Sequence, residues 1–360
     1  MDSIKLIQAS ALIDSSSSIV TANGLQLMPH APEKSLVFRT SGTSGDGKFI
    51  VLQKAGILSS AHCVNRFLEI NQTSVFGLIL PWWHVGGMGV IARSFVAGCR
   101  MVHFADRWNP LACCEWIARE KITHLSLVPT QIHDLFTSYS EAPNSLRAVV
   151  VGGGNLPESV EVGARKLGWP LLRSFGMTEA SSQIATQKPY DFNQSFDEGG
   201  LSILDCWQAR INEGGLLEIA GEPLFSGTLY KQDDRWDYVP REGKWWTTSD
   251  RVALEARTLR WLGRADDLVK ILGELVSLHR VEEELAVAGL VPGTYAVIAA
   301  SDERKEHALH LFSESEAKDV IHRYHATCAG FARIDAIHRI SLPRTELGKI
   351  RRGDLLKVLG

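Results

Sequence analysis

The sequence lacks the features that mark membrane-spanning, exported or nucleic-acid-binding proteins. No stretch approaches the ~18 consecutive apolar residues that a membrane-spanning helix needs. Residues 1–20 have no basic start followed by an apolar core, so no signal peptide and no membrane insertion are expected. The formal net charge of −3 argues against a nucleic-acid partner held by a dominant basic face.

Cysteine is also sparse. The chain of 360 residues has six cysteines, and no two of them have the Cys-x-x-Cys spacing. The usual signal for a zinc ribbon or a thiol-exchange site is therefore missing, and the cysteines do not form a dense disulfide framework. We expect buried, reduced thiols and a cytoplasmic protein.

The sequence does contain strand and helix patterns in alternation. Residues 1–33 predict a loosely packed lead-in. Short aliphatic runs predict strands at 35–40, 49–53, 75–80, 124–129 and 146–153. Longer amphipathic runs predict helices at 56–70, 110–122, 129–139 and 157–168. This alternation is typical of layered α/β folds.

The pattern of predicted strands and helices changes twice towards the carboxyl terminus. From about residue 200 short strands and tight turns predict a β-rich section. After residue 263 a further α/β pattern begins, with strands at 294–301 and 307–314 and helices at 278–289 and 317–330. We therefore expect a large N-terminal α/β domain with layered sheets over residues 1–263, and a small C-terminal α+β domain over residues 264–360.

The segment RTSGTSGDGKFIVLQ, residues 39–53, fits all but the last position of a Walker A phosphate loop. Such a loop runs from a strand into a helix and needs Ser or Thr after its lysine. Here Phe49 follows Lys48 and strand-forming residues continue, so the loop is predicted to join two strands. Its amides, hydroxyls, glycines and Lys48 still suit a polyphosphate, with a plain Gly/Ser-rich turn as the alternative.

Further motifs follow this loop in a fixed order. They are VVVGGGNLPES (149–159), SFGMTEASSQ (174–183), TTSDRVAL (247–254), GRADDLVKILGELVSLHRVEEEL (263–285) and LPRTELGKIRRGDL (342–355). Together they resemble the acyl-adenylate-forming superfamily of acyl-CoA synthetases, luciferases and peptide-synthetase adenylation domains. The resemblance implies the adenylate-forming enzyme fold, with a mobile C-terminal domain. It also implies a reaction in two halves: a carboxylate attacks the α-phosphate of ATP to give acyl-AMP, and coenzyme A then takes the acyl group.

The resemblance assigns roles to individual residues. ATP would be bound by Thr40, Ser41, Gly42, Thr43, Ser44, Gly45, Lys48, Gly153, Gly154, Ser174, Phe175, Gly176, Asp250 and Arg264. Thr178 would bond the α-phosphate, and Glu179 would ligate Mg²⁺, a hard cation that prefers oxygen. Lys349 would bridge the substrate carboxylate and the α-phosphate. Asp266 would be the hinge of the small domain. Alternatively, Asp266 and Asp267 would cap the next helix.

The segment LPWWHVGGMGVIARSFVAGCRMV, residues 80–102, is predicted to shape the acyl site. His84 would act at the junction of the acyl and thiol tunnels, or be a packed core histidine. Gly152 and Ser181 would line the substrate site. Arg93 would pair with a substrate carboxylate through its bidentate fork, or form a salt bridge beneath the site. These runs look most like the 2-succinylbenzoate–CoA ligases of menaquinone synthesis.

The chain departs from the family in its phosphate loop, which usually reads Pro-Lys-Gly, and in its shorter amino-terminal region. The shortening predicts exposed apolar surface that a homodimer or another partner would cover. The leading hypothesis is an acid–CoA ligase that uses ATP, Mg²⁺ and coenzyme A. The alternatives are a ligase for another aryl or short acyl acid, a carrier-protein-loading enzyme, and a non-catalytic relative that binds nucleotide or acyl ligand.

Overall fold

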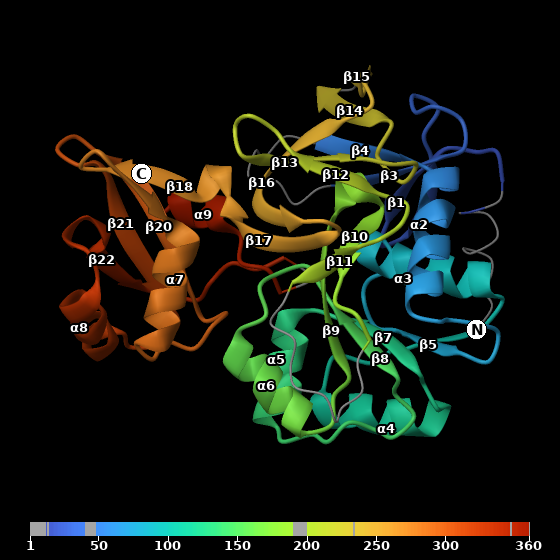
Figure 1. Ribbon diagram of the computed structural model, residues 1–360, viewed down its shortest axis with the longest axis horizontal. Coiled ribbons are helices and arrows are strands. Elements are labelled where there is room, and N and C mark those ends of the chain that lie inside the picture. The colour runs from blue at the N-terminus through green and yellow to red at the C-terminus, as the bar shows by residue number, and fades with distance from the viewer. Residues whose placement is uncertain are drawn as a thin grey trace. The chain divides into compact units, whose positions relative to one another are not determined.

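The computed structural model describes residue 12 and residues 14–39, 48–189, 200–232, 235–345 and 348–359 (Figure 1). The chain divides into two compact units. The first comprises Met1–Arg210, Glu218–Thr247 and Leu254–Arg260, and the second comprises Ile211–Leu217, Thr248–Ala253 and Trp261–Gly360. The predicted domain boundary at residue 264 stays a prediction. None of the described helices is both long enough and apolar enough to cross a membrane.

A six-stranded sheet opens the first unit. Its order is β15 (Arg235–Pro240), β14 (Gly227–Gln232), β4 (Lys48–Gln53), β3 (Ser35–Arg39), β1 (Ser18–Thr21) and β2 (Gly24–Leu27). Strands β3 and β4 pair antiparallel, so the segment between them joins two strands, as the sequence predicts. The predicted loose lead-in is wrong for residues 14–33, because β1 pairs with β2 and β3, and Val20 and Met28 are buried.

An eleven-stranded sheet follows. Its order is β12 (Gln208–Ile211), β13 (Leu216–Ala220), β16 (Trp246–Glu255), β17 (Thr258–Arg264), β11 (Leu201–Ile203), β10 (Ser182–Thr186), β9 (Leu171–Met177), β8 (Ala148–Val151), β7 (His124–Leu127), β5 (Val75–Leu78) and β6 (Arg100–His103). From β9 to β6 all neighbours are parallel. Parallel neighbours bring the carboxyl ends of their strands to one edge, which is where ligands bind in open α/β sheets.

Helices cover both faces of the parallel strands. Helices α4 (Pro110–Glu120), α5 (Pro129–Thr137) and α6 (Glu158–Lys166) share a buried core with Leu125 and Leu127 of β7. Side chains alternate along a strand, so Ser126 between these two leucines points to the opposite face. There it contacts α3 (Val85–Ala97), which packs beside α2 (Lys54–Phe67).

Helix α3 has no counterpart among the helices that the sequence pattern predicts, because three glycines lie in its first two turns. One of them, Gly87, is needed for packing. A methyl group there would overlap the carbonyl oxygen of Pro81, so only glycine allows the helix to approach the preceding turn so closely. Gly87 thus weakens the helical pattern in the sequence and is also required for the packing of the helix.

The second unit is built on a three-stranded sheet of β20 (Tyr295–Asp302), β21 (Glu306–Ser313) and β22 (Ile334–Arg339). Helices α7 (Leu278–Val287) and α8 (Lys318–Thr327) share one core with this sheet, and α9 (Arg352–Leu356) shares another (Figure 1). A hairpin of β18 (Leu268–Ile271) and β19 (Glu274–Ser277) precedes α7.

The start of α7 decides one alternative. Ser277 is its N-cap, with Oγ accepting from the backbone N–H of Arg280 at 3.3 Å. Asp266 lies in the 3₁₀ turn η2 (Ala265–Asp267), which leads into a strand. The suggested capping role for Asp266 and Asp267 is therefore wrong, while the hinge role of Asp266 stays a prediction.

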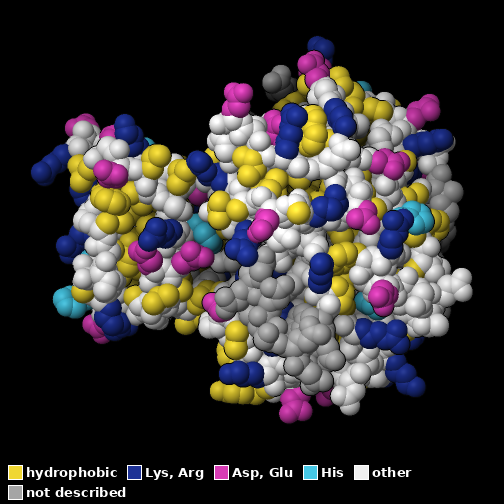
Figure 2. All heavy atoms as spheres, viewed as in Figure 1, with side chains coloured by type: hydrophobic (Ala, Val, Ile, Leu, Met, Phe, Trp, Pro, Cys, Tyr) yellow, Lys and Arg dark blue, Asp and Glu magenta, His cyan; other side chains and the backbone are white. Residues whose placement is uncertain are grey.

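Charge is distributed evenly over the visible surface. On the face drawn in Figure 2, basic and acidic side chains intermix, and neither sign forms a broad field. The described cysteines are free thiols, of which Cys113 is fully buried and the others are half-buried. The expectation of buried thiols therefore holds fully for Cys113 alone among them.

Candidate active site

Three of the predicted segments meet at the carboxyl edge of the parallel strands. Gly152 directly follows β8, and Thr178 directly follows β9, the neighbouring strand. His84 is the N-cap of α3, the helix that comes after β5 in the same parallel set. The fold thus places the glycine loop, the Phe-Gly-x-Thr-Glu motif and the histidine segment along one edge.

The glycine loop presents bare backbone beside Ser174. A Cβ atom at Gly152 would lie 2.8 Å from the Ser174 hydroxyl, which itself donates to the carbonyl of Val151 at 3.0 Å. Gly153 has a φ of +83° and is exposed, as is Gly154. The absence of side chains leaves flat walls against which a planar group can lie. Phe175 follows on β9 and is half-buried.

Thr178 and Glu179 begin the 3₁₀ turn η1 (Thr178–Ala180), which fastens their backbone and leaves their side chains available. The carbonyl of Glu179 accepts from the N–H of Phe225 at 2.8 Å, and the carbonyl of Thr178 accepts from Ser181 at 3.2 Å. Within the described part of the chain neither side chain has a hydrogen-bond or ion-pair partner. A hydroxyl and a carboxylate of this kind fit a phosphate oxygen and a Mg²⁺ ion.

The described residues contain no group of three or more His, Cys, Asp or Glu side chains placed to hold a metal. A magnesium ion at Glu179 would therefore take most of its ligands from phosphate and water, which is its usual preference in nucleotide sites.

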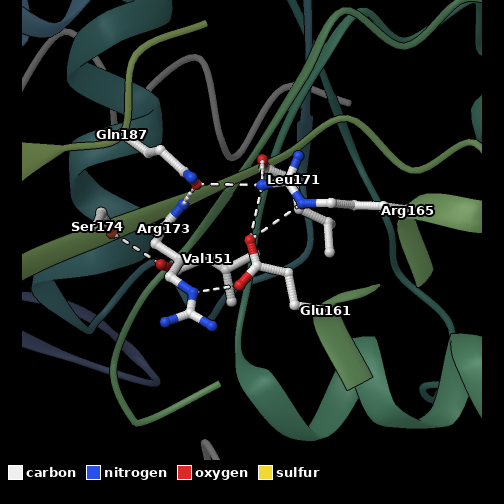
Figure 3. A network of polar contacts seen from close by, with 7 residues as sticks. All are labelled: Val151, Glu161, Arg165, Leu171, Arg173, Ser174 and Gln187. Carbon is white, nitrogen blue, oxygen red and sulfur yellow. Dashed lines mark hydrogen bonds and ion pairs between the residues drawn. The ribbon is translucent and has the colours of Figure 1, made fainter. Parts of the chain in front are cut away.

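A buried ionic network supports the strand that carries this motif (Figure 3). Glu161 of α6 is fully buried and accepts from Arg165 at 2.7 and 3.0 Å and from Arg173 of β9. Arg165 also donates to the Leu171 carbonyl at 2.6 Å. Desolvation lowers the pKa of Arg165, and Glu161 opposes that shift. The network ties α6 to β9 directly before Ser174.

Arg93 is a charged side chain that is almost completely buried in the first unit. It is 3% exposed, and its Nη1 donates to the Ser126 hydroxyl at 3.3 Å. Among the described residues it has no ion-pair partner. Desolvation alone lowers its pKa to about 10, so it keeps its proton at neutral pH. A buried guanidinium that has no carboxylate partner among the described residues is costly in free energy.

The neighbouring His124 carries no charge that could neutralise or repel the Arg93 guanidinium. Desolvation, helped by the charges of Arg147 and Arg93, lowers the pKa of His124 to about 4, although a hydrogen bond with the Leu68 backbone opposes the shift. His124 is therefore neutral at pH 7, and its Nδ1 lies 2.8 Å from the Thr123 hydroxyl.

A glycine and a strained turn flank the Arg93 guanidinium. A Cβ atom at Gly89 would lie 3.1 Å from Arg93 Nη2 and 3.5 Å from Ser182 Oγ, so the three groups are close together. Ser181 and Ser182 have φ values of 51° and 105°, which L-residues rarely adopt. The buried Ser181 hydroxyl donates to the Pro223 carbonyl at 2.7 Å.

Gly176 is sterically required within β9, where this strand pairs with β10. A methyl group there would overlap the carbonyl oxygen of Ser182 on the paired strand. We expect Gly176→Ala to lower the free energy of unfolding by about 1–3 kcal/mol, because the backbone must move apart. Gly154→Ala is the control, since its Cβ would meet only Pro129 at 3.6 Å. Denaturant unfolding of both variants measures the difference, and equal stability would refute the close approach.

The second unit gathers three other predicted residues. Asp250 is buried and accepts from the indole N–H of Trp261 at 2.8 Å. Lys349 and Arg264 are exposed residues of the same unit. Desolvation lowers the pKa of Lys349, the charges of Arg264 and Arg352 add to the shift, and Asp267 and Asp250 oppose it. The carboxylates and cations that act on this amine therefore come from three of the predicted motifs, at residues 247–254, 263–285 and 342–355.

The structure describes only part of the predicted phosphate loop. Lys48 is exposed at the start of β4. Residues 40–45 of the predicted phosphate loop lie outside the described residues. The sequence analysis assigns no role to Gly89, which lies inside the predicted acyl-site segment, nor to Ser126 and Glu161. Each of these residues acquires its neighbours only when distant elements pack.

Known proteins share both the sequence and the fold of this chain. The family model described as AMP-binding enzyme matches residues 11–228. A 2-succinylbenzoate–CoA ligase of Staphylococcus aureus (strain bovine RF122 / ET3-1) is 27% identical over 88% of this chain, which spans 66% of that relative's length.

Solved structures show the same fold. An o-succinylbenzoate CoA synthetase from Bacillus subtilis in complex with its acyl-adenylate intermediate has a TM-score of 0.76 at 22% identity, over 92% of this chain and 71% of that chain. The Bacillus subtilis enzyme in complex with ATP and magnesium has a TM-score of 0.74 at 23% identity, over 89% and 69%. The predicted fold class is thereby confirmed.

Proposed function

Because this chain belongs to the family of AMP-binding enzymes, we propose that it is an ATP-dependent carboxylic acid–CoA ligase that forms an acyl-AMP. We propose 2-succinylbenzoate as its acid, a step of menaquinone biosynthesis. The observation that carries the choice of acid is Arg93, a buried cation that no described residue neutralises. An acid with two carboxylates can place one against this guanidinium and leave the other to react. The named relatives support the same substrate.

The first half-reaction requires little covalent chemistry from the protein. The bare backbone at Gly153 and Gly154, with Ser174 and Phe175, would hold the adenine base, and the Thr178 hydroxyl would bond the α-phosphate. Glu179 would hold Mg²⁺, which neutralises phosphate charge when bound. Asp250 would accept from the ribose hydroxyls, and Arg264 would add a charge-assisted contact. Binding in this geometry brings the carboxylate and the α-phosphate together and lowers the entropic part of the barrier.

Lys349 would complete the site for that step. Its ammonium would contact both the substrate carboxylate and the α-phosphate, two anions that otherwise repel one another. Rotation of the C-terminal domain about Asp266 would then withdraw Lys349 and bring the surface around Gly273 over the acyl-AMP. His84 would stand where the thiol of coenzyme A enters, so that one site serves both half-reactions. A cytoplasmic location and a homodimer belong to the same proposal.

Pyrophosphate release tests the proposal directly. The protein is incubated with ATP, Mg²⁺ and a panel of acids: 2-succinylbenzoate, benzoate, other aryl acids and short acyl acids. We expect release with 2-succinylbenzoate and formation of its thioester when coenzyme A is added. Release with other acids only would overturn the substrate, and thioester formed only on a carrier protein would overturn the acceptor. No release with any acid would identify a binding protein.

A further inference from the structure

The segment that carries Lys349 is held at both ends by arginine–glutamate pairs within the second unit. On the amino-terminal side, Nη2 of Arg344 contacts the two carboxylate oxygens of Glu314 at 3.0 and 3.1 Å. On the carboxyl-terminal side, Nη2 of Arg352 contacts both carboxylate oxygens of Glu282 at 2.7 Å. Charge-assisted contacts of this kind are among the strongest that a side chain makes.

Hydrogen bonds between Thr345 and Lys349 hold the backbone at the lysine. The N–H of Thr345 donates to the Lys349 carbonyl at 2.8 Å, and the Thr345 hydroxyl accepts from the Lys349 N–H at 3.2 Å. Gly348 has a φ of +75°, and Ile350 packs against the apolar core shared with β20 and β21. These contacts hold the backbone atoms from which the Lys349 side chain extends. The direction of the side chain then depends on the pairs that Arg344 and Arg352 form with their glutamates.

Glu282 connects that segment to the body of the unit. It lies on α7, and one of its oxygens accepts from the backbone N–H of Val297 on β20 at 2.7 Å. Nη1 of Arg352 donates to the carbonyl of the same Val297 at 2.8 Å. Desolvation lowers the pKa of Arg352, but Glu282, followed by Asp267 and Tyr295, opposes this, so the pKa is raised overall. One carboxylate thus joins a helix, a strand and the lysine segment.

Glu282 pairs with one of the cations that act on Lys349. Arg352 is one of two cations that act on the Lys349 amine, together with Arg264, while Asp267 and Asp250 act in the opposite sense. Glu282 compensates Arg352 at a separation of 2.7 Å. Removing that negative charge would leave Arg352 uncompensated, three residues from the lysine, and would favour the neutral amine.

We propose that Glu282 is a positioning residue for Lys349: through Arg352 it holds the lysine segment in place for acyl-adenylate formation. This rests on the proposed function, in which Lys349 takes part in the first half-reaction only. The two half-reactions therefore separate a positioning role from a purely structural one.

The test compares Glu282→Gln with Glu284→Gln. Glu284 lies on the same helix, in a surface pair with Arg280 at 3.0 Å. We expect Glu282→Gln to slow pyrophosphate release from acid and ATP about tenfold, because a charge-assisted pair is lost. Thioester formation from supplied acyl-AMP and coenzyme A should be unchanged. The alkaline limit of the first half-reaction should shift to lower pH, and Glu284→Gln should resemble the wild type in all three measurements.

The other possible results distinguish a positioning role of Glu282 from a purely structural one. Equal losses in both half-reactions, with an unchanged pH limit, would show that Glu282 only braces the fold, and no loss would also overturn the proposal. If Glu282→Gln does not fold, Glu282→Asp keeps the charge but is shorter, so it should retain the pH limit and still slow the first half-reaction. A wild type that releases no pyrophosphate removes the proposed function itself, whereas an active wild type with an unaffected variant removes only the role of Glu282.

Discussion

Lys349→Ala is expected to slow acyl-adenylate formation by roughly 10²–10³-fold, the usual cost of removing one group that stabilises transition-state charge. The reason is electrostatic. The carboxylate and the α-phosphate both carry negative charge, and an ammonium between them offsets the repulsion in a site from which water is excluded. Pyrophosphate release under single-turnover conditions measures the loss. Thioester formation from supplied acyl-AMP should continue at close to the wild-type rate.

The pH profile of the wild type checks the same assignment. Desolvation, together with Arg264 and Arg352, lowers the pKa of Lys349. The ammonium is present below that pKa and lost above it, so the first half-reaction should decline on the alkaline side at a lower pH than lysine in water would give. Lys349→Arg, which stays protonated, should remove this decline. A variant at position 349 that slows both half-reactions equally would contradict the assignment.

Arg93→Met is the second substitution for which we expect a large effect. We expect the KM for 2-succinylbenzoate to rise about 100-fold, or ~3 kcal/mol, because a buried charge-assisted pair with the substrate is lost. The KM for ATP should change little. Arg93 has no carboxylate partner among the described residues, so the free protein should be as stable as the wild type or more stable. Thermal unfolding of the ligand-free protein measures this second effect.

Two controls sharpen the Arg93 test. Arg93→Lys keeps the charge and loses the planar fork, so its KM for the acid should lie between those of the wild type and Arg93→Met. Benzoate has no second carboxylate, so any activity with it should be insensitive to either variant. A parallel rise in the KM values for acid and ATP would place Arg93 outside the acyl site, and a less stable Arg93→Met protein would show that it braces the fold.

The described structure explains why the motifs were readable from the sequence. Thr178 and Glu179 are neighbours in the chain, and Gly348 directly precedes Lys349, so each local conformation depends on residues that are adjacent in the sequence. The same holds for the hairpin of β3 and β4, which the strand-forming residues after Lys48 predict. Helix α3 could not be predicted in this way, because Gly87 weakens the helical pattern and is required only by the approach of Pro81.

Residue types at short spacing are enough to predict the family resemblance, the layered α/β class and the order of the motifs. The folded chain was needed to show that Arg93 is buried without a carboxylate partner among the described residues and that Glu282 contacts Arg352. The first depends on contact with Ser126, 33 residues away, and the second joins residues separated by 70 positions. Contacts over such distances form when strands and helices pack, and no local pattern specifies them.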